Sequence, residues 1–143
     1  MKHVKIDSIY VIRLERGERI VESLTGFCRQ KRITAASFQG LGTCRQAELG
    51  FFHRRSRRYK FRTFPQDFEI ASLLGNVSVF QGKPLIHAHI VLGGSDFTAK
   101  TGHLKEAEVL ATCEIVLVPM KRALARKIDR ASGLSLLDFI PNS

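Results

Sequence analysis

The chain has 143 residues, of which 44% are hydrophobic and 25% are charged, so it holds enough apolar material for one core of ordinary size. Its 23 lysines and arginines against 13 aspartates and glutamates give a net charge of +10, which favours contact with polyanions, nucleic acid first and anionic membrane second. No apolar run is long enough to span a membrane, and the first residues lack a signal-peptide pattern, so a cytoplasmic protein is expected.

Several classes of site are disfavoured by what the chain lacks. The cysteines, Cys28, Cys44 and Cys113, are odd in number and widely spaced, which argues against a disulfide framework or a cysteine zinc site. The patterns GxGxxG, GxxxxGK[ST], GxSxG and HExxH do not occur. The sequence therefore leaves open whether the protein is an enzyme and indicates none of these reaction types.

The first predicted elements are a strand and a helix. Residues 8–15 alternate and are rich in β-branched side chains, as in a strand. From residue 18 to about residue 32, apolar side chains recur at helical spacing, which predicts an amphipathic helix. Gly26 costs this helix about 1 kcal/mol relative to alanine, so we expect it to mark close packing on a sheet. His3 is expected to lie in a disordered terminus.

Strands dominate the rest of the chain. They are predicted over residues 33–40, 48–53, 57–64, 68–80, 85–92 and 112–118, with 68–80 forming either one long strand or two short ones. Residues 104–110 are ambiguous, 121–130 suit a short basic helix, and 133–137 suit a docking segment. Because most connections are too short for parallel crossovers, we expect an α+β fold. Residues 1–143 would form a single domain whose core spans about 8–118, with a C-terminal tail over 119–143. In it, a mostly antiparallel, twisted central sheet packs against the amphipathic helix.

Three histidines form the most informative pattern. His87 and His89 are two residues apart in an apolar strand, so both imidazoles leave the same face. His103 follows a short, glycine-bounded excursion that could bring it back beside them. Three neutral imidazoles at one point suit a divalent transition metal, with a fourth position open to water, substrate or a carboxylate of a neighbouring subunit. Alternatively, two core-facing histidines hydrogen-bond to backbone or carboxylate groups, and His103 caps a turn.

A second pattern is a basic hairpin with its tip at residues 54–57. Its cations have Tyr59 and Phe61 between them and no acidic neighbour; they are Arg54, Arg55, Arg57, Arg58, Lys60 and Arg62. Such a ribbon could contact nucleic-acid phosphates, or it could be a solvated hairpin whose charges protect a sheet edge. Phe51 and Phe52 are interpreted as packing residues, in the core or between subunits, and not as platforms for stacking.

Short stretches in a fixed order add a family resemblance. They are Gln39-Gly40-Leu41-Gly42, Phe68-Glu69-Ile70 with Ser72-Leu73, His87-Ala88-His89, and Gly102-His103-Leu104 followed by Cys113-Glu114. Together they resemble the plant and prokaryote conserved (PPC) domain over residues 10–118. The resemblance implies a central antiparallel sheet, a homotrimer, a three-histidine site for zinc or another divalent metal, and DNA binding without an established reaction.

The chain departs from plant members of that family in two ways. It lacks the Arg-Gly-Arg-Pro hook, and Gln66-Asp67 stand where the plant members carry Gly-Arg, so no role of that arginine is transferred. The sequence then favours a homotrimeric DNA-binding protein with a histidine-bound metal. A metal-dependent enzyme acting on a small anionic substrate and a structural module with a trimer-stabilising metal remain as alternatives.

Overall fold

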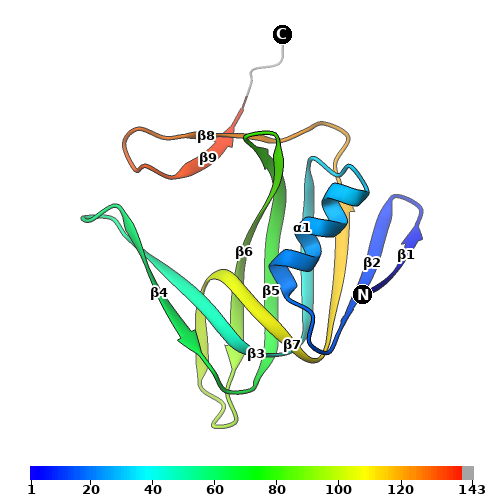
Figure 1. Ribbon diagram of the computed structural model, residues 1–143, viewed down its shortest axis with the longest axis vertical. Coiled ribbons are helices and arrows are strands. Elements are labelled where there is room, and N and C mark those ends of the chain that lie inside the picture. Colours follow the sequence, from blue (N-terminus) through cyan, green and yellow to red (C-terminus); the bar gives the residue numbers. More distant parts are fainter. Residues whose placement is uncertain (140–143) are drawn as a thin grey trace.

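Two long strands, β3 (Ala36–His53) and β7 (Ala99–Pro119), form the centre of the sheet (Figure 1). The structure is a computed structural model that describes residues 1–139. The other elements, in chain order, are β1 (Lys2–Ile6), β2 (Ile9–Glu15), α1 (Ile20–Gln30), β4 (Arg58–Phe64), β5 (Phe68–Phe80), β6 (Lys83–Gly93), β8 (Ala125–Ile128) and β9 (Ser135–Asp138). The predicted strands at 33–40 and 48–53 are parts of β3, and the ambiguous 104–110 belongs to β7.

The sheet closes on itself at one end. Strand β7 pairs with β6 through residues 99–103 and with β3 through residues 103–119, while β5 pairs with both β3 and β6. Register shifts along β3 and β7 let these long strands bend from one partner to the next. All strand pairs among residues 1–139 are antiparallel except the short contact of β8 with β5, so the sheet is mixed.

The core lies between α1 and one face of the sheet. The helix buries Ile20, Leu24, Phe27 and Cys28 at 1% exposure or less. They pack against sheet residues that include Ile12, Leu14, Leu73, Ile90, Leu92, Ile115 and Leu117. Each large apolar side chain buried in this way contributes about 1.5–3 kcal/mol to stability. The opposite face of the sheet, which we call the outer face, carries the histidines.

The first turn of α1 is capped from a distant strand. Its N-cap residue, Arg19, makes no side-chain cap hydrogen bond. Instead, the Glu106 carboxylate on β7 accepts hydrogen bonds from the backbone N–H groups of Val21 (2.8 Å) and Glu22 (3.1 Å). A negative charge at the N-terminal end of a helix is favourable, so this contact fixes α1 against the sheet as well as capping it.

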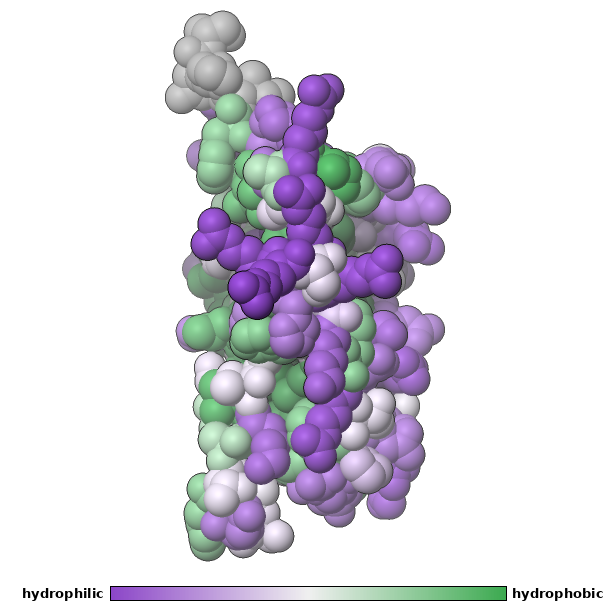
Figure 2. All heavy atoms as spheres, turned by 90° about the vertical axis from the view of Figure 1, so that its left-hand side faces the viewer, coloured by the Kyte–Doolittle hydropathy of each residue, from purple (hydrophilic) through white to green (hydrophobic). Residues whose placement is uncertain are grey.

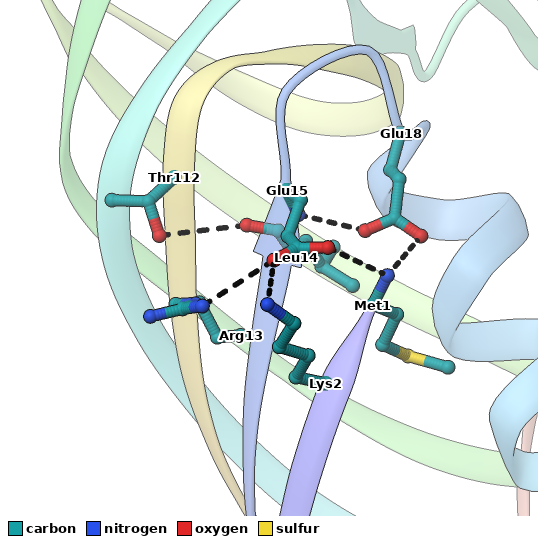
Figure 3. A network of polar contacts seen from close by, with 7 residues as sticks. All are labelled: Met1, Lys2, Arg13, Leu14, Glu15, Glu18 and Thr112. Atoms are coloured by element: carbon teal, nitrogen blue, oxygen red, sulfur yellow. Dashed lines mark hydrogen bonds and ion pairs between the residues drawn. The ribbon is translucent and has the colours of Figure 1, made fainter.

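Polar contacts hold β1 and β2 to the start of the helix (Figure 3). The Glu18 carboxylate contacts the Met1 ammonium at 2.7 Å and accepts a hydrogen bond from the Glu15 backbone N–H at 2.7 Å. Lys2 pairs with the Glu15 carboxylate at 3.0 Å. The N-terminal residues are therefore ordered, and the expectation of a disordered His3 is wrong: its ring lies 5.0 Å from that of Phe27.

Two further expectations are corrected by the structure. A Cβ atom at Gly26 would meet nothing within 4 Å, so this glycine does not mark close packing. Residues 121–130 are not helical; they contain β8, which pairs with β9 as a hairpin and contacts β5. Within residues 1–139, no helix has both the length and the apolar character needed to cross a membrane.

Candidate metal centre and nucleic-acid interface

The three predicted histidines come together on the outer face of the sheet. Along β6, His87 and His89 alternate with the buried Ala88 and Ile90, so both imidazoles point away from the core. His103 on β7 is the direct cross-strand partner of His89. The excursion between the two strands is thus a hairpin connection, and it returns the third imidazole to the other two as the sequence predicted.

The cluster has the dimensions of a site that a small shift could close around an ion. One ring nitrogen from each histidine lies within 4.8 Å of the corresponding atoms of the other two. The ring centroids are 5.3–5.6 Å apart. Zinc bonds of 2.0–2.1 Å in a tetrahedral arrangement need nitrogens roughly 3.4 Å apart, a difference that side-chain rotation can supply. His89 is exposed, so the cluster opens to solvent on its side.

Two of the three imidazoles, those of His87 and His103, have lowered pKa values, which favours the neutral form that binds metals. Burial lowers the pKa of His87 to about 4, with smaller contributions from the charge of Arg126 and from the other two histidines. Burial is also the main reason why the pKa of His103 lies below its ordinary value, followed by the charges of His89 and Arg126. Protons therefore compete weakly for these two ligands at neutral pH.

Arg126, from β8, reaches the edge of the cluster, a contact that was not predicted from the sequence. Its Nη2 atom lies 3.3 Å from His87 Nδ1 and donates a hydrogen bond to Asn76 Oδ1 at 3.0 Å. Its Nε and Nη1 atoms donate to Ser78 Oγ and to the Ser135 carbonyl, each at 2.7 Å. Because a guanidinium can only donate, His87 Nδ1 accepts, and Nε2 carries the hydrogen of the neutral ring.

One atom of His103 provides an observation that fits metal binding by the cluster. Its Nδ1 atom is buried and has no hydrogen-bond partner among residues 1–139. A buried polar atom without a partner is costly, and a metal bound to the cluster would fix this ring in place. On its other side the ring lies 4.9 Å from that of Tyr59, on β4. The cluster therefore touches the basic hairpin directly.

The histidines also border an apolar surface. A row of direct cross-strand partners crosses the outer face, in the order Val11, Val116, Gln39, Leu74, His89, His103. Leu74 is 56% exposed, and Leu41, on the same face, is 60% exposed. A groove of about 420 Å³ runs between them. Exposed aliphatic side chains gathered on one sheet face are typical of a surface that contacts another protein chain.

The basic hairpin is an arm that projects from the sheet. We define the arm as residues 49–64, in which β4 pairs with β3 alone. Figure 2 shows this side of the molecule, with hydrophilic side chains gathered at mid-height over the arm. The six predicted cations are all exposed; they are Arg54, Arg55, Arg57, Arg58, Lys60 and Arg62. The arm thus combines an open sheet edge with a dense positive surface.

The two faces of the arm differ. On the face continuous with the outer side of the sheet, the ring of Tyr59 stacks on that of Phe61 at 5.4 Å and contacts His103. Gly50 makes this possible, because a Cβ atom there would lie 2.7 Å from the Phe61 ring. The opposite face carries Phe51, which is 67% exposed. Phe51 is therefore not a core residue, and its alternative interpretation, packing between subunits, stays a prediction.

Sequence reasoning missed two neighbours of the cluster, Arg126 and Tyr59. The sequence did carry a signal that Arg126 lies in a strand and not in a helix, because the residues that follow it suit a hairpin turn. Asp129 and Ser132 form a hydrogen-bonded turn, and Gly133 has a φ of +77°, so this segment carries ordinary hairpin turn chemistry. No local pattern predicts that Tyr59 contacts His103, because this contact depends on the register of β4 along β3.

Solved structures similar to this chain include a protein described as DNA-binding, a PPC protein and a metal-containing protein. A "putative dna binding protein" from Bacteroides thetaiotaomicron is 31% identical, with 96% of each chain covered and a TM-score of 0.93. A PPC protein from Pyrococcus horikoshii is 28% identical, covering 99% of this chain and 96% of that one, with a TM-score of 0.86. A metal-containing protein from Archaeoglobus fulgidus is 32% identical, covering 94% and 96%, with a TM-score of 0.88.

A search of curated proteins found no match. A family model, in contrast, matches most of the chain. Residues 1–121 match the family described as the Plants and Prokaryotes Conserved (PCC) domain. The matched residues include every strand from β1 to β7 and all three histidines. The chain belongs to this family, also known as the PPC domain.

Proposed function

We propose that the protein is a DNA-binding PPC-domain protein whose basic arm contacts phosphates and whose three histidines hold a divalent metal ion, zinc by preference. The observation that carries this proposal is the contact between Tyr59 on the arm and His103 in the cluster. A metal ion bound by the histidines would fix His103 and, through it, the place of the arm. The names of the relatives support both parts, DNA binding in one and metal content in another.

The donor set supports zinc. Three imidazole nitrogens with an open fourth position match zinc sites in which water or another group completes the coordination. Other divalent transition metals also bind imidazole, so the choice of metal depends on geometry and supply. The three free cysteines are all buried, which fits a reducing compartment such as the cytoplasm and leaves the histidines as the candidate ligands.

We further propose that the chain assembles as a homotrimer through the outer face of the sheet. Leu41 and Leu74 stand exposed there beside His89, so association would cover apolar surface and bring a neighbouring subunit close to the open side of the cluster. Three arms in one assembly would form a larger positive surface than one chain offers. The proposed unit includes the whole chain, residues 1–143.

DNA binding is tested by the salt dependence of affinity. Fluorescence anisotropy with a labelled duplex should give an affinity that falls steeply with salt concentration. Replacing Arg54 and Arg55 together by glutamine should reduce the slope of log affinity against log salt by roughly two units, about one for each lost phosphate contact. The matched control replaces Arg16 and Lys31, which are equally basic and exposed but lie outside the arm.

The outcome separates the two interpretations of the arm. A slope that changes with the arm variant and not with the control supports phosphate contacts. An affinity that is flat between low and moderate salt, or equal losses in both variants, contradicts them and leaves the charges as edge protection.

A metal-dependent enzyme acting on a small anionic substrate is the second candidate. It is favoured by the exposure of His89, which leaves one side of the cluster accessible, and by the Arg126 guanidinium, which lies beside His87. Alanine at all three histidines should then abolish turnover and leave DNA affinity unchanged. Elemental analysis of the purified protein with and without this replacement decides first whether the cluster binds a metal.

A further inference from the structure

The face of the arm that carries Phe51 has a composition that phosphate contacts alone do not explain. Leu49 and Phe51 are two residues apart on β3, without a register shift between them, so they share a face. Leu49 is buried in the core at 5% exposure, whereas Phe51 stands beyond the core at 67% exposure. A large aromatic ring is therefore presented to solvent at the point where the arm leaves the sheet.

Cations on the neighbouring strand β4 line one side of this ring at regular intervals. The direct cross-strand partner of Phe51 is Lys60, and on the same face Arg58 lies opposite His53 and Arg62 opposite Leu49. All three of these β4 side chains are exposed. Same-face positions on a strand are about 7 Å apart, so the charges form a line beside the ring. The His53 ring extends the aromatic surface, with its centroid 5.1 Å from that of Phe51.

This surface is separate from the proposed subunit interface. The exposed aliphatic row and the histidines lie on the outer face, which continues along the arm through Gly50, Tyr59 and Phe61. Phe51 lies on the other side of the same two strands. A trimer formed through the outer face would therefore leave the Phe51 surface accessible.

We infer that the arm binds single-stranded nucleic acid, with one unpaired base stacked on Phe51 and the flanking phosphates on Arg58, Lys60 and Arg62. This inference rests on the proposed DNA binding and specifies its substrate class. A base within a duplex has both faces covered by its neighbours, so only an unpaired or extruded base can meet the ring. An aromatic platform within a positive groove is the usual means of binding single strands without sequence preference.

The test compares single-stranded and duplex ligands of equal length by fluorescence anisotropy, with oligo-dT as the single strand. Wild-type protein should bind the single strand more tightly. Phe51→Ala should weaken single-strand binding by roughly fivefold to more than a hundredfold, the range for one lost base stack, and leave duplex affinity nearly unchanged. Phe51→Leu, which keeps apolar volume without a π face, should lose nearly as much. Phe97→Ala is the matched control, because Phe97 is 98% exposed but follows an acidic residue, Asp96, outside the arm.

A direct readout is available because the chain contains no tryptophan. Phe51→Trp places a single fluorophore at the proposed platform, and its emission should be quenched on adding oligo-dT. Phe97→Trp, in the same assay, should show little change. The Trp variant also reports binding independently of any loss of fold in the alanine variant.

Each result decides one question. Equal affinity for single strand and duplex, an unquenched Phe51→Trp, or equal losses on both ligands overturns the single-strand inference and leaves DNA binding intact. A changed oligomeric state of Phe51→Ala in sedimentation overturns it in favour of a subunit contact. A wild-type protein that binds neither ligand contradicts the proposed DNA binding itself.

Discussion

The three cysteine side chains show how burial alone determines chemical behaviour. Burial raises the pKa of Cys28, Cys44 and Cys113 to about 12 each, with small additions from Asp67 at Cys44 and from Cys44 and Glu114 at Cys113. At pH 8 the thiolate fraction of such a group is on the order of one in ten thousand. Thiolate is the reactive form, so these residues serve as small apolar core groups in the folded protein.

We predict that a thiol reagent at pH 8 labels none of the three cysteines rapidly in the native protein and all three in denaturant. Stability should also fall as pH rises above about 9, the ordinary thiol pKa, because the unfolded chain then releases protons that the folded chain retains. Urea unfolding at pH 8 and pH 10 measures this change. Rapid labelling of the native protein would contradict the burial of these side chains.

Two glycines illustrate opposite effects of the same substitution. At Gly42 the φ is +150°, and a Cβ atom would lie 2.2 Å from the Thr112 carbonyl oxygen, a backbone atom of the central strand β7. At Gly26, in α1, a Cβ atom meets nothing within 4 Å. The first glycine permits a close approach of two strands, and the second only adds conformational freedom to the unfolded chain.

Gly26→Ala should therefore stabilise the protein by about 0.5–1 kcal/mol, whereas Gly42→Ala should destabilise it by about 2 kcal/mol or more. Chemical denaturation of the two variants beside wild type gives both values. If Gly42→Ala were neutral, the close pairing of β3 with β7 at this position would be wrong.

Among the elements, the C-terminal hairpin β8–β9 is joined to the histidine cluster through Arg126. The guanidinium needs a lone pair on His87 Nδ1. A neutral imidazole that binds a metal through Nε2 carries its hydrogen on Nδ1, and one that binds through Nδ1 has no lone pair left there. In either case, metal binding by His87 removes the acceptor, so the hairpin and the metal compete for one atom.

We therefore predict that zinc makes the backbone amides of β8–β9 exchange severalfold faster with solvent, as measured by hydrogen-exchange mass spectrometry. Arg126→Met should show fast exchange with or without zinc. Lys127→Met, which removes only the Lys127–Asp138 ion pair, keeps the zinc response. Slower exchange of β8–β9 in wild type on adding zinc would contradict the competition.

The elements that could be predicted are those specified by local pattern. The histidine cluster was within reach because a strand places His87 and His89 on one face and a short hairpin returns His103 to them. Helix α1 could be predicted from the spacing of its apolar residues. Its capping by Glu106 could not be predicted, because Glu106 lies 85 residues from Val21. The tail was mistaken for a helix because its charge pattern suits one, while pairing with β5 overrides that preference.

At the scale of the whole molecule, the outer face is the surface through which we propose that chains associate. Leu74 lies in its middle, in the row of partners that ends at the histidines. An exposed apolar residue outside the sheet provides a comparison: Phe97, in the turn between β6 and β7, is 98% exposed, against 56% for Leu74. Arginine at either position replaces an exposed apolar side chain, but only Leu74 lies on the outer face.

We predict that wild-type protein sediments as a trimer and that Leu74→Arg sediments as a monomer, because the trimer would bury a charge without a partner. Phe97→Arg should remain a trimer. Circular dichroism confirms that each variant is folded, and Leu41→Arg provides a second substitution on the outer face. A monomeric wild type, or dissociation by Phe97→Arg instead of Leu74→Arg, would refute assembly through the outer face.

The pairing of β2 with β7 joins segments near the two ends of the part that matches the family, residues 1–121, with Tyr10 opposite Leu117. During synthesis, β2 emerges from the ribosome long before its partner exists. Until β7 follows, the nascent chain must keep β2 and the apolar side of α1 uncovered. Closure of the sheet is thus a late folding event of high contact order, and apolar surface stays exposed until β7 is available.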